Sequence, residues 1–197
     1  MDSKPSDTVP YPVKILVAGG FGVGKTTLVG AVSEIRPLQT EELLTEQSVG
    51  VDDTSGVERK TTTTVAMDFG RITLSERLIL YLFGTPGQDR FWFMWDELAE
   101  GALGAVVLAD TRRLAECFPA VDYFERRGLP FIVGVNCFED GYDYAPGEIS
   151  AALDLSPDIP VLLCDVRMRE SGKQVLTTLV RHVIARRAQR TAGAASG

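Results

Sequence analysis

The feature that most constrains the fold is a glycine-rich loop near the start of the chain. The segment GGFGVGKT, residues 19–26, satisfies the pattern G-x-x-x-x-G-K-T. An apolar run at Val13–Ala18 precedes it and is typical of a buried strand. From about Lys25 to Ile35 the sequence favours a helix, which Pro37 ends. A strand, a glycine-rich turn and a helix in this order are the context in which the pattern binds the phosphates of a nucleoside triphosphate.

Each part of this loop has a chemical reason. The glycines let backbone N–H groups turn toward phosphate oxygens, and the start of the helix adds its positive end. We expect Lys25 to bridge the β- and γ-phosphates and to act in catalysis, and Thr26 to offer its hydroxyl to Mg²⁺. The alternative is a chance match in a glycine-rich turn. The nucleotide-binding residues expected in this region are Gly19, Gly20, Phe21, Gly22, Val23, Gly24, Lys25, Thr26 and Thr27.

Apolar runs and helical stretches alternate along the rest of the chain. Further strands are predicted at 65–74, 77–83, 103–109, 130–136 and 160–164, and helices near 89–100, 114–127, 147–153 and 171–190. The alternation predicts a three-layer α/β fold of the P-loop NTPase class, with helices on both faces of a six-stranded, mostly parallel sheet. We expect one domain at 13–190, a flexible leader at 1–12 and a disordered tail at 191–197. The polar segment 38–60 is predicted as a long mobile loop.

Composition and charge narrow the function classes. A net charge of -7 lacks the basic footprint that nucleic-acid binding needs. The cysteines Cys117, Cys137 and Cys164 are far apart, which favours neither a zinc site nor a disulfide framework, and free thiols suit a reducing cytoplasm. No apolar run approaches the roughly 20 residues of a membrane span. We therefore expect a cytoplasmic protein that reaches a membrane only through a partner.

A run of four threonines, residues 61–64, leads into the second predicted strand. Together with Asp68-Phe69 it resembles the first switch of the Ras-like superfamily, in which a threonine just before this strand binds Mg²⁺. Matching Asp68-Phe69 to the similar pair of Rab-type proteins selects Thr64 as the residue that binds nucleotide and metal. Thr63 is the alternative register, and threonine is also simply a good strand residue.

The segment GTPGQ, residues 84–88, follows the next predicted strand and resembles the second switch of the same superfamily. The resemblance implies that the Gly87 N–H contacts the γ-phosphate and that Gln88, a catalytic residue, orients the attacking water. A Pro-Gly turn without a further role is the alternative.

Two residues depart from the family pattern near the expected chemistry. Gly84 stands where Ras-type proteins carry a magnesium-linked aspartate, and Phe21 stands where Ras has a glycine close to the γ-phosphate. The candidates to replace the missing carboxylate are Asp68, Asp52 and Asp53. We expect both departures to slow GTP hydrolysis without abolishing nucleotide binding.

The segment NCFED, residues 136–140, ends the strand predicted at 130–136. The superfamily selects guanine with Asn-Lys-x-Asp at this place. Asn136 matches, a cysteine replaces the lysine, and Glu139 stands at the aspartate position with Asp140 beside it. A carboxylate can accept hydrogen bonds from guanine N1–H and N2–H₂, although an ordinary acidic loop is the alternative. After the last strand, Asp165-Val166 lies where the family's Ser-Ala-Lys loop touches the guanine oxygen.

Over roughly residues 13–190 the chain thus resembles a Ras-like small GTPase. The proline of TPGQ, the missing aspartate and the altered base motif look like the bacterial MglA-type group, especially the small GTPases of actinobacterial conservon operons. The resemblance implies a switch that binds GTP or GDP with Mg²⁺, and partners that include a Roadblock-domain protein and a sensor-kinase-like membrane protein. The alternatives are a nucleotide-binding scaffold with little or no hydrolysis, and a P-loop ATPase or kinase.

The segment FWFMW, residues 91–95, contains both tryptophans of the chain. On a helix, a spacing of three and four residues predicts one core-facing stripe, which consists of Phe91, Met94, Trp95 and Leu98. Trp92 and Phe93 would then face either a partner or a larger core. The only histidine, His182, is predicted to lie on the surface of the last helix without a catalytic role.

Overall fold

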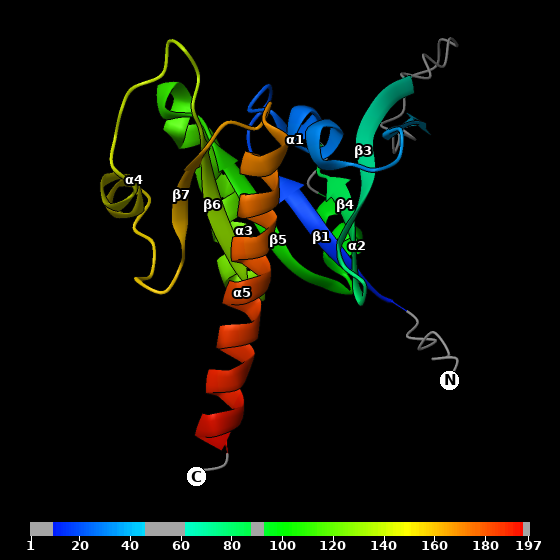
Figure 1. Ribbon diagram of the computed structural model, residues 1–197. Helices are drawn as coiled ribbons and strands as arrows, with labels where there is room; N and C mark the ends of the chain where they lie inside the picture. The colour runs from blue at the N-terminus through cyan, green and yellow to red at the C-terminus, as the bar shows by residue number, and fades with distance from the viewer. Residues whose placement is uncertain (1–9, 46–61, 88–92, 195–197) are drawn as a thin grey trace, which may run out of the picture.

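In the computed structural model, residues 10–45, 62–87 and 93–194 are described, and they form a seven-stranded sheet with helices on both faces (Figure 1). The strands are β1 (Tyr11–Ala18), β2 (Leu38–Thr45), β3 (Thr62–Ser75), β4 (Leu78–Gly84), β5 (Ala102–Ala109), β6 (Phe131–Asn136) and β7 (Val161–Cys164). The helices are α1 (Lys25–Val32), α2 (Phe93–Ala99), the 3₁₀ segment η2 (Thr111–Cys117), α3 (Phe118–Arg127), α4 (Pro146–Ala152) and α5 (Arg169–Ala194). Side by side, the strands run in the order β2-β3-β4-β1-β5-β6-β7.

The sheet is parallel except at one end. β1 pairs in parallel with β4 and β5, β5 with β6, and β6 with β7. β3 runs antiparallel to both β4 and β2. Strands that are covered on both faces consist of near-continuous apolar residues, and all six residues of β6 are buried. The carboxyl ends of the parallel strands therefore meet at one edge, where open α/β sheets place their ligands.

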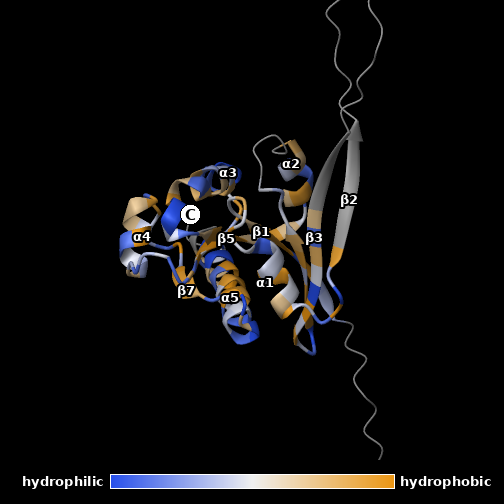
Figure 2. Cartoon of the chain, turned by 90° about the horizontal axis from the view of Figure 1, so that it is seen from above, coloured by the Kyte–Doolittle hydropathy of each residue, from blue (hydrophilic) through white to orange (hydrophobic). Residues whose placement is uncertain are grey.

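Two apolar clusters fill the space between the layers. α1 and α5 cover one face, with Leu28 and Leu176 fully buried, and α2, α3 and α4 contribute to the cluster on the other face. Figure 2 shows α1 and α5 on one side of the sheet and α2 and α3 on the opposite side. The Trp95 ring stacks on the Phe124 ring with 5.7 Å between centroids. This packing fixes the position of β1, and with it the loop that follows.

The predicted aromatic stripe is confirmed where the structure describes it. Met94, Trp95 and Leu98 are buried, and Phe93 is 61% exposed. Phe91 and Trp92 lie outside the described residues.

The three-layer α/β class is confirmed, and all six predicted strands are present. A further strand, β2, lies in the segment predicted as a loop. Its sequence, LQTEELLT, carries two glutamates and no clear alternation, so local propensity gives a weak signal. β3 supplies an antiparallel partner along its whole length, from Leu38 opposite Phe69 to Thr45 opposite Thr62. Strand formation here depends on this pairing more than on the sequence of the strand itself.

The ends of the fold differ slightly from prediction. β1 starts at Tyr11, inside the predicted leader, and α5 continues to Ala194, inside the predicted tail. The structure does not describe residues 1–9, 46–61, 88–92 and 195–197. The predicted residues Asp52, Asp53 and Gln88 therefore lie outside the described residues. Among the helices of the described ranges, none has the length and apolar character needed to cross a membrane.

His182 is not the surface residue that was predicted. It is only 9% exposed, because α5 turns it toward the sheet one turn after the fully buried Leu179. Burial lowers the pKa of the imidazole, Arg186 lowers it further, and Asp158 opposes the shift. Within the part of the chain that the structure describes, the His182 Nε2 atom has no hydrogen-bond partner.

Candidate functional site: a phosphate loop joined to a base loop

The predicted phosphate loop connects β1 to α1 at the carboxyl edge of the sheet. Gly24 precedes the helix with φ 107°, a left-handed conformation that favours glycine. Space also requires a glycine here, because a Cβ at Gly24 would lie 2.9 Å from Val166 Cγ2 and 3.0 Å from Asn136 Nδ2. The phosphate loop therefore packs directly against two residues of the predicted base pocket.

Lys25 lies inside this loop. Its Nζ donates hydrogen bonds to the Gly19 and Gly20 carbonyl oxygens at 2.9 and 2.8 Å. Burial lowers the pKa of Lys25 to about 8, and the nearby Asp68 and Glu116 carboxylates oppose that shift. A Cβ at Gly87 would lie 2.6 Å from Lys25 Nζ and 3.2 Å from the Phe21 nitrogen. The structure thus brings Gly87 of the second switch to the phosphate loop.

Asp68 fills the space left by the missing aspartate. The Thr26 hydroxyl donates a hydrogen bond of 2.6 Å to Asp68 Oδ2. A Cβ at Gly84 would lie 3.1 Å from both Asp68 Cβ and Asp68 Oδ2. β3 therefore places a carboxylate over Gly84 and beside the threonine expected to bind Mg²⁺. A hydroxyl and a carboxylate are the hard oxygen donors that Mg²⁺ takes together with substrate phosphates, so these residues fit the ion.

Thr64 lies elsewhere in this structure. It is part of β3 and pairs with Leu43. Because a strand rises about 3.3 Å per residue, its Cα is about 13 Å along β3 from that of Asp68. The structure does not bring Thr64, or its alternative Thr63, beside Thr26.

Asn136 ties the base pocket to the phosphate loop. Its Nδ2 donates to the Val23 carbonyl at 3.1 Å, and its Oδ1 accepts from the Val166 N–H at 3.2 Å. Asn136 is 5% exposed, so both contacts are shielded from water. One amide side chain thus holds together the segments that follow β1, β6 and β7.

A cavity of about 370 Å³ lies between these segments. Its lining comprises Gly22, Gly24, Thr27, Asn136, Cys137, Phe138, Glu139, Asp140, Val166 and Arg167. Glu139 and Asp165 both pair with Arg167, at 3.5 and 2.9 Å. The Asp165 carboxylate also accepts the Arg167 backbone N–H, and these contacts lower the pKa of Asp165, the side-chain hydrogen bond most. Among the lining residues are the predicted Glu139, Asp140 and Val166.

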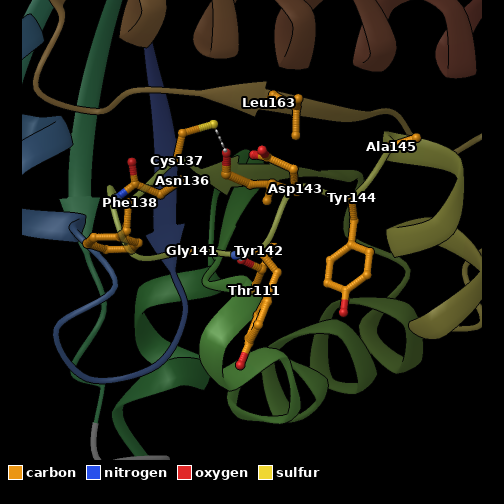
Figure 3. A pocket seen from close by; sticks show the side chains of 11 residues that line it. Thr111, Asn136, Cys137, Phe138, Gly141, Tyr142, Asp143, Tyr144, Ala145 and Leu163 are labelled. Atoms are coloured by element: carbon orange, nitrogen blue, oxygen red, sulfur yellow. Dashed lines mark hydrogen bonds between the residues drawn. The ribbon is translucent and has the colours of Figure 1, made fainter.

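A second cavity, of about 280 Å³, shares Asn136, Cys137 and Phe138 with the first. Figure 3 shows its lining, in which the Tyr142 and Tyr144 rings lie side by side, 6.1 Å apart between centroids. The base loop, which we define as residues 137–141, therefore borders both cavities. Side chains of another element contact this loop.

These side chains belong to the segment after β5, which sequence reasoning missed and which contacts both the base loop and the phosphate loop. Arg112 pairs with Asp110 and Asp140, and Arg113 donates to the Phe21 carbonyl at 3.1 Å. Glu116 packs against the phosphate loop, since a Cβ at Gly20 would lie 2.8 Å from its Cβ. The only sequence signal is a run of charged residues after a buried strand, which is also typical of an ordinary surface turn.

A protein-family model described as "conserved hypothetical ATP binding protein" matches residues 17–186. The chain belongs to this family. The chain is also 32% identical over 126 residues to the uncharacterized protein MJ1339 of Methanocaldococcus jannaschii, covering 63% of this chain and 69% of that protein. Neither description names a reaction.

Solved structures with the same fold include the cytosolic domain of the FeoB iron transporter of T. maritima. Its apo form matches with a TM-score of 0.61 at 18% sequence identity, and the match covers 88% of this chain. Its GDP form I matches with a TM-score of 0.63 at 17% identity, and that match covers 89% of this chain. This chain spans 64% of either structure's length. The G domain of the same transporter gives 0.59 at 18% identity, covering 87% of this chain and 99% of that domain. The family member described here therefore has a P-loop GTPase-like fold.

Proposed function

We propose that this protein is a guanine-nucleotide-binding switch that hydrolyses GTP slowly. The observation that carries the proposal is the pair of hydrogen bonds made by Asn136, which join the phosphate loop to the segments expected to surround a purine. Such a tie makes phosphate binding and base binding one event. A site that bound phosphate alone would have no need of it.

The carboxylates of the base loop favour guanine over adenine. Guanine presents N1–H and N2–H₂ as donors on one edge, which a carboxylate can accept together. Adenine presents an acceptor at N1 and would leave the carboxylate facing a lone pair. Glu139 lines the cavity with its side chain 90% exposed, and its contact of 3.5 Å to Arg167 leaves it accessible to such an edge.

Lys25, Thr26 and Asp68 support a triphosphate with Mg²⁺. Lys25 is already inside the loop and would neutralise phosphate charge, and Thr26 with Asp68 would hold the ion. Bound Mg²⁺ would supply positive charge to the phosphate oxygens. Gly87 is close enough to the loop for its N–H to respond to the γ-phosphate. Thr64 would join them only after a rearrangement of the first switch.

We expect slow GTP hydrolysis because of one residue of the phosphate loop. Phe21 stands in the phosphate loop where Ras has a glycine close to the γ-phosphate, and its side chain is 67% exposed. We expect GTP hydrolysis that a partner accelerates, as in other GTPases whose catalytic groups are incomplete without one.

The deciding experiment is calorimetric titration of nucleotide-free protein with GTP, GDP and ATP, with and without Mg²⁺. Guanine nucleotides should bind at least about 10-fold more tightly than ATP, because a mismatched charged hydrogen bond costs about 1.5–3 kcal/mol. Equal or tighter ATP binding would contradict the proposal. It would favour the alternative of a P-loop ATPase or kinase, and it would agree with the ATP binding that the family description names.

A second assay separates a slow GTPase from a scaffold. Single-turnover GTP hydrolysis by the isolated protein should be measurable and should fall when Lys25 is replaced by alanine. Absence of hydrolysis, alone and with a stimulating partner, would favour the scaffold. Hydrolysis as fast as that of a fully activated GTPase would contradict the proposed slow rate.

We further propose that the switch belongs to the MglA-type group and signals through a Roadblock-domain protein and a sensor-kinase-like membrane protein. The resemblance of residues 84–88 and 136–140 supports this, and the exposed Phe93 on α2 offers a contact next to the second switch. The test is binding of a purified Roadblock-domain protein to the GDP-loaded and GTP-loaded forms. Equal affinity for the two forms would contradict a nucleotide-dependent partner.

A further inference from the structure

Arg112 connects the end of β5 to the base loop through three kinds of contact. Its Nε and Nη2 donate to the two oxygens of Asp110 at 2.9 and 2.7 Å. Its Nη1 donates to Asp140 Oδ1 at 2.5 Å. Its guanidinium carbon lies 3.9 Å from the centre of the Phe138 ring, within the range of a cation–π contact. One side chain thus holds two of the five residues of the base loop.

The other end of this arrangement is rigid. Asp110 is 4% exposed and also accepts the Arg112 backbone N–H at 3.0 Å. The side-chain hydrogen bond from Arg112 is the main reason that the pKa of Asp110 is lowered, so the carboxylate stays charged at neutral pH. Two parallel hydrogen bonds to a buried carboxylate fix the plane of the guanidinium. Nearby, the Thr111 hydroxyl accepts the Tyr142 N–H at 2.9 Å and fixes the end of the base loop.

The two acidic residues of the base loop consequently differ. Asp140 is engaged by Arg112, whereas Glu139 has a longer contact of 3.5 Å to the exposed Arg167 side chain, whose hydrogen bonds go to Asp165. Building on the proposed guanine function, we infer that Arg112 is a specificity-determining positioning residue. It draws Asp140 to itself and fixes Phe138, so that Glu139 is the carboxylate presented to the guanine edge.

The test compares the affinities for GDP and IDP, which differ only in the exocyclic 2-amino group that the carboxylate accepts. Wild-type protein should prefer GDP, and Glu139→Gln should remove most of that preference. Arg112→Ala should lower the ratio of GDP affinity to IDP affinity by about 10-fold, which is the effect expected from the loss of one charged hydrogen bond. Arg112→Lys should restore it only in part, because an ammonium cannot form the paired contact. Asp140→Asn should keep most of the preference.

Arg113 is the matched control. It is the neighbouring arginine and also approaches Asp110, at 3.6 Å, but its hydrogen bonds go to Glu116 and to the Phe21 carbonyl of the phosphate loop, not to the base loop. Arg113→Ala should change GDP and IDP affinities by the same factor and leave their ratio intact, which a general loss of order would not do. Circular dichroism and melting temperature show whether each variant is folded. If Arg112→Ala fails to fold, the affinities of Arg112→Lys for GDP and IDP test the inference instead.

The outcomes separate the inference from the function on which it rests. If wild-type protein binds no nucleotide, or binds ADP as tightly as GDP, the proposed function fails and this inference with it. If wild-type protein selects guanine but Arg112→Ala keeps the GDP-to-IDP ratio, only the inference is overturned. It is also overturned if Asp140→Asn removes the preference and Glu139→Gln retains it.

Discussion

Asp68 and Gly84 face each other from neighbouring strands and are mutually dependent. A Cβ at position 84 would lie 3.1 Å from the Asp68 carboxylate, which is tighter than an ordinary contact, so the glycine gives Asp68 room to reach Thr26. Two carboxylates in this space would repel each other. We interpret the pair as a transfer of the magnesium-linked carboxylate from β4 to β3.

This interpretation leads to a paired substitution test. Asp68→Asn should weaken Mg²⁺-dependent GDP binding by about 10-fold or more, as expected for loss of a charged contact. Gly84→Asp alone should not improve binding, because of the steric and charge conflict. Asp68→Ala combined with Gly84→Asp should recover much of the lost affinity. Calorimetry over a range of Mg²⁺ concentrations measures all three, and an Asp68→Asn variant with wild-type magnesium dependence would contradict the transfer.

Lys25 gives the site a pH dependence. Its pKa of about 8 in the free protein means that it loses its charge as the pH rises through 8. Bound phosphate anions would favour the charged form and raise this pKa. Nucleotide affinity should therefore be full well below pH 8 and should decline above it, with proton uptake on binding near pH 8. Titrations in buffers of different ionisation enthalpy count that proton, and a pH-independent affinity between pH 7 and 9.5 would argue against the role of Lys25.

At the scale of elements, the apolar strands and the phosphate loop could be predicted from sequence because local signals define them. β5 and β6 are unbroken apolar runs, and the loop before α1 is a spaced motif. β2 could not be predicted, because its stability comes from a partner strand whose paired residues lie 17 to 31 positions away in sequence. The roles of Arg112 and Asp68 could not be fixed either, since each depends on which side chain the fold places opposite it. Spacing along the chain contains no such information.

The packing of α5 against α1 can be tested by a single substitution. A Cβ at Gly172 would lie 2.5 Å from Val32 Cγ1 and 2.9 Å from Leu28 Cδ1. Gly172→Ala should therefore force the helices apart and destabilise the protein by about 1–3 kcal/mol, the usual cost of overpacking. Gly147→Ala in α4 is the control, because a Cβ there meets nothing within 4 Å. Denaturant unfolding compares the two, and equal stabilities would show that the α1–α5 contact can relax.

At the scale of the whole molecule, charge is distributed unevenly. The chain carries a net charge of -7, whereas Arg181, Arg186, Arg187 and Arg190 lie near the end of α5, which Figure 1 shows extending past the sheet. His182 sits among these arginines but faces the core. Burial, and to a lesser degree the charge of Arg186, disfavour a positive charge on its imidazole and lower its pKa.

The stability of the fold should therefore depend on pH through His182. Its pKa is lowered in the folded state from an ordinary value near 6.5. The unfolded chain then takes up the proton first as the pH falls, so stability is full above about pH 6.5 and declines as the pH drops toward the folded-state pKa. For one proton the slope is at most about 1.4 kcal/mol per pH unit.

Melting temperatures at pH 7.5, 6.5 and 5.5 test this for wild-type protein and His182→Gln. Because the chain has only one histidine, a difference in slope between the two proteins in this range isolates its titration from that of the many carboxylates. Wild-type protein should lose more stability than the variant between pH 7.5 and 5.5, even if the variant melts lower at every pH. Parallel slopes would mean that the folded protein accepts the proton on His182 as readily as the unfolded chain, through water or movement of Asp158. Burial at the α5–sheet contact would then impose no pH limit on the fold.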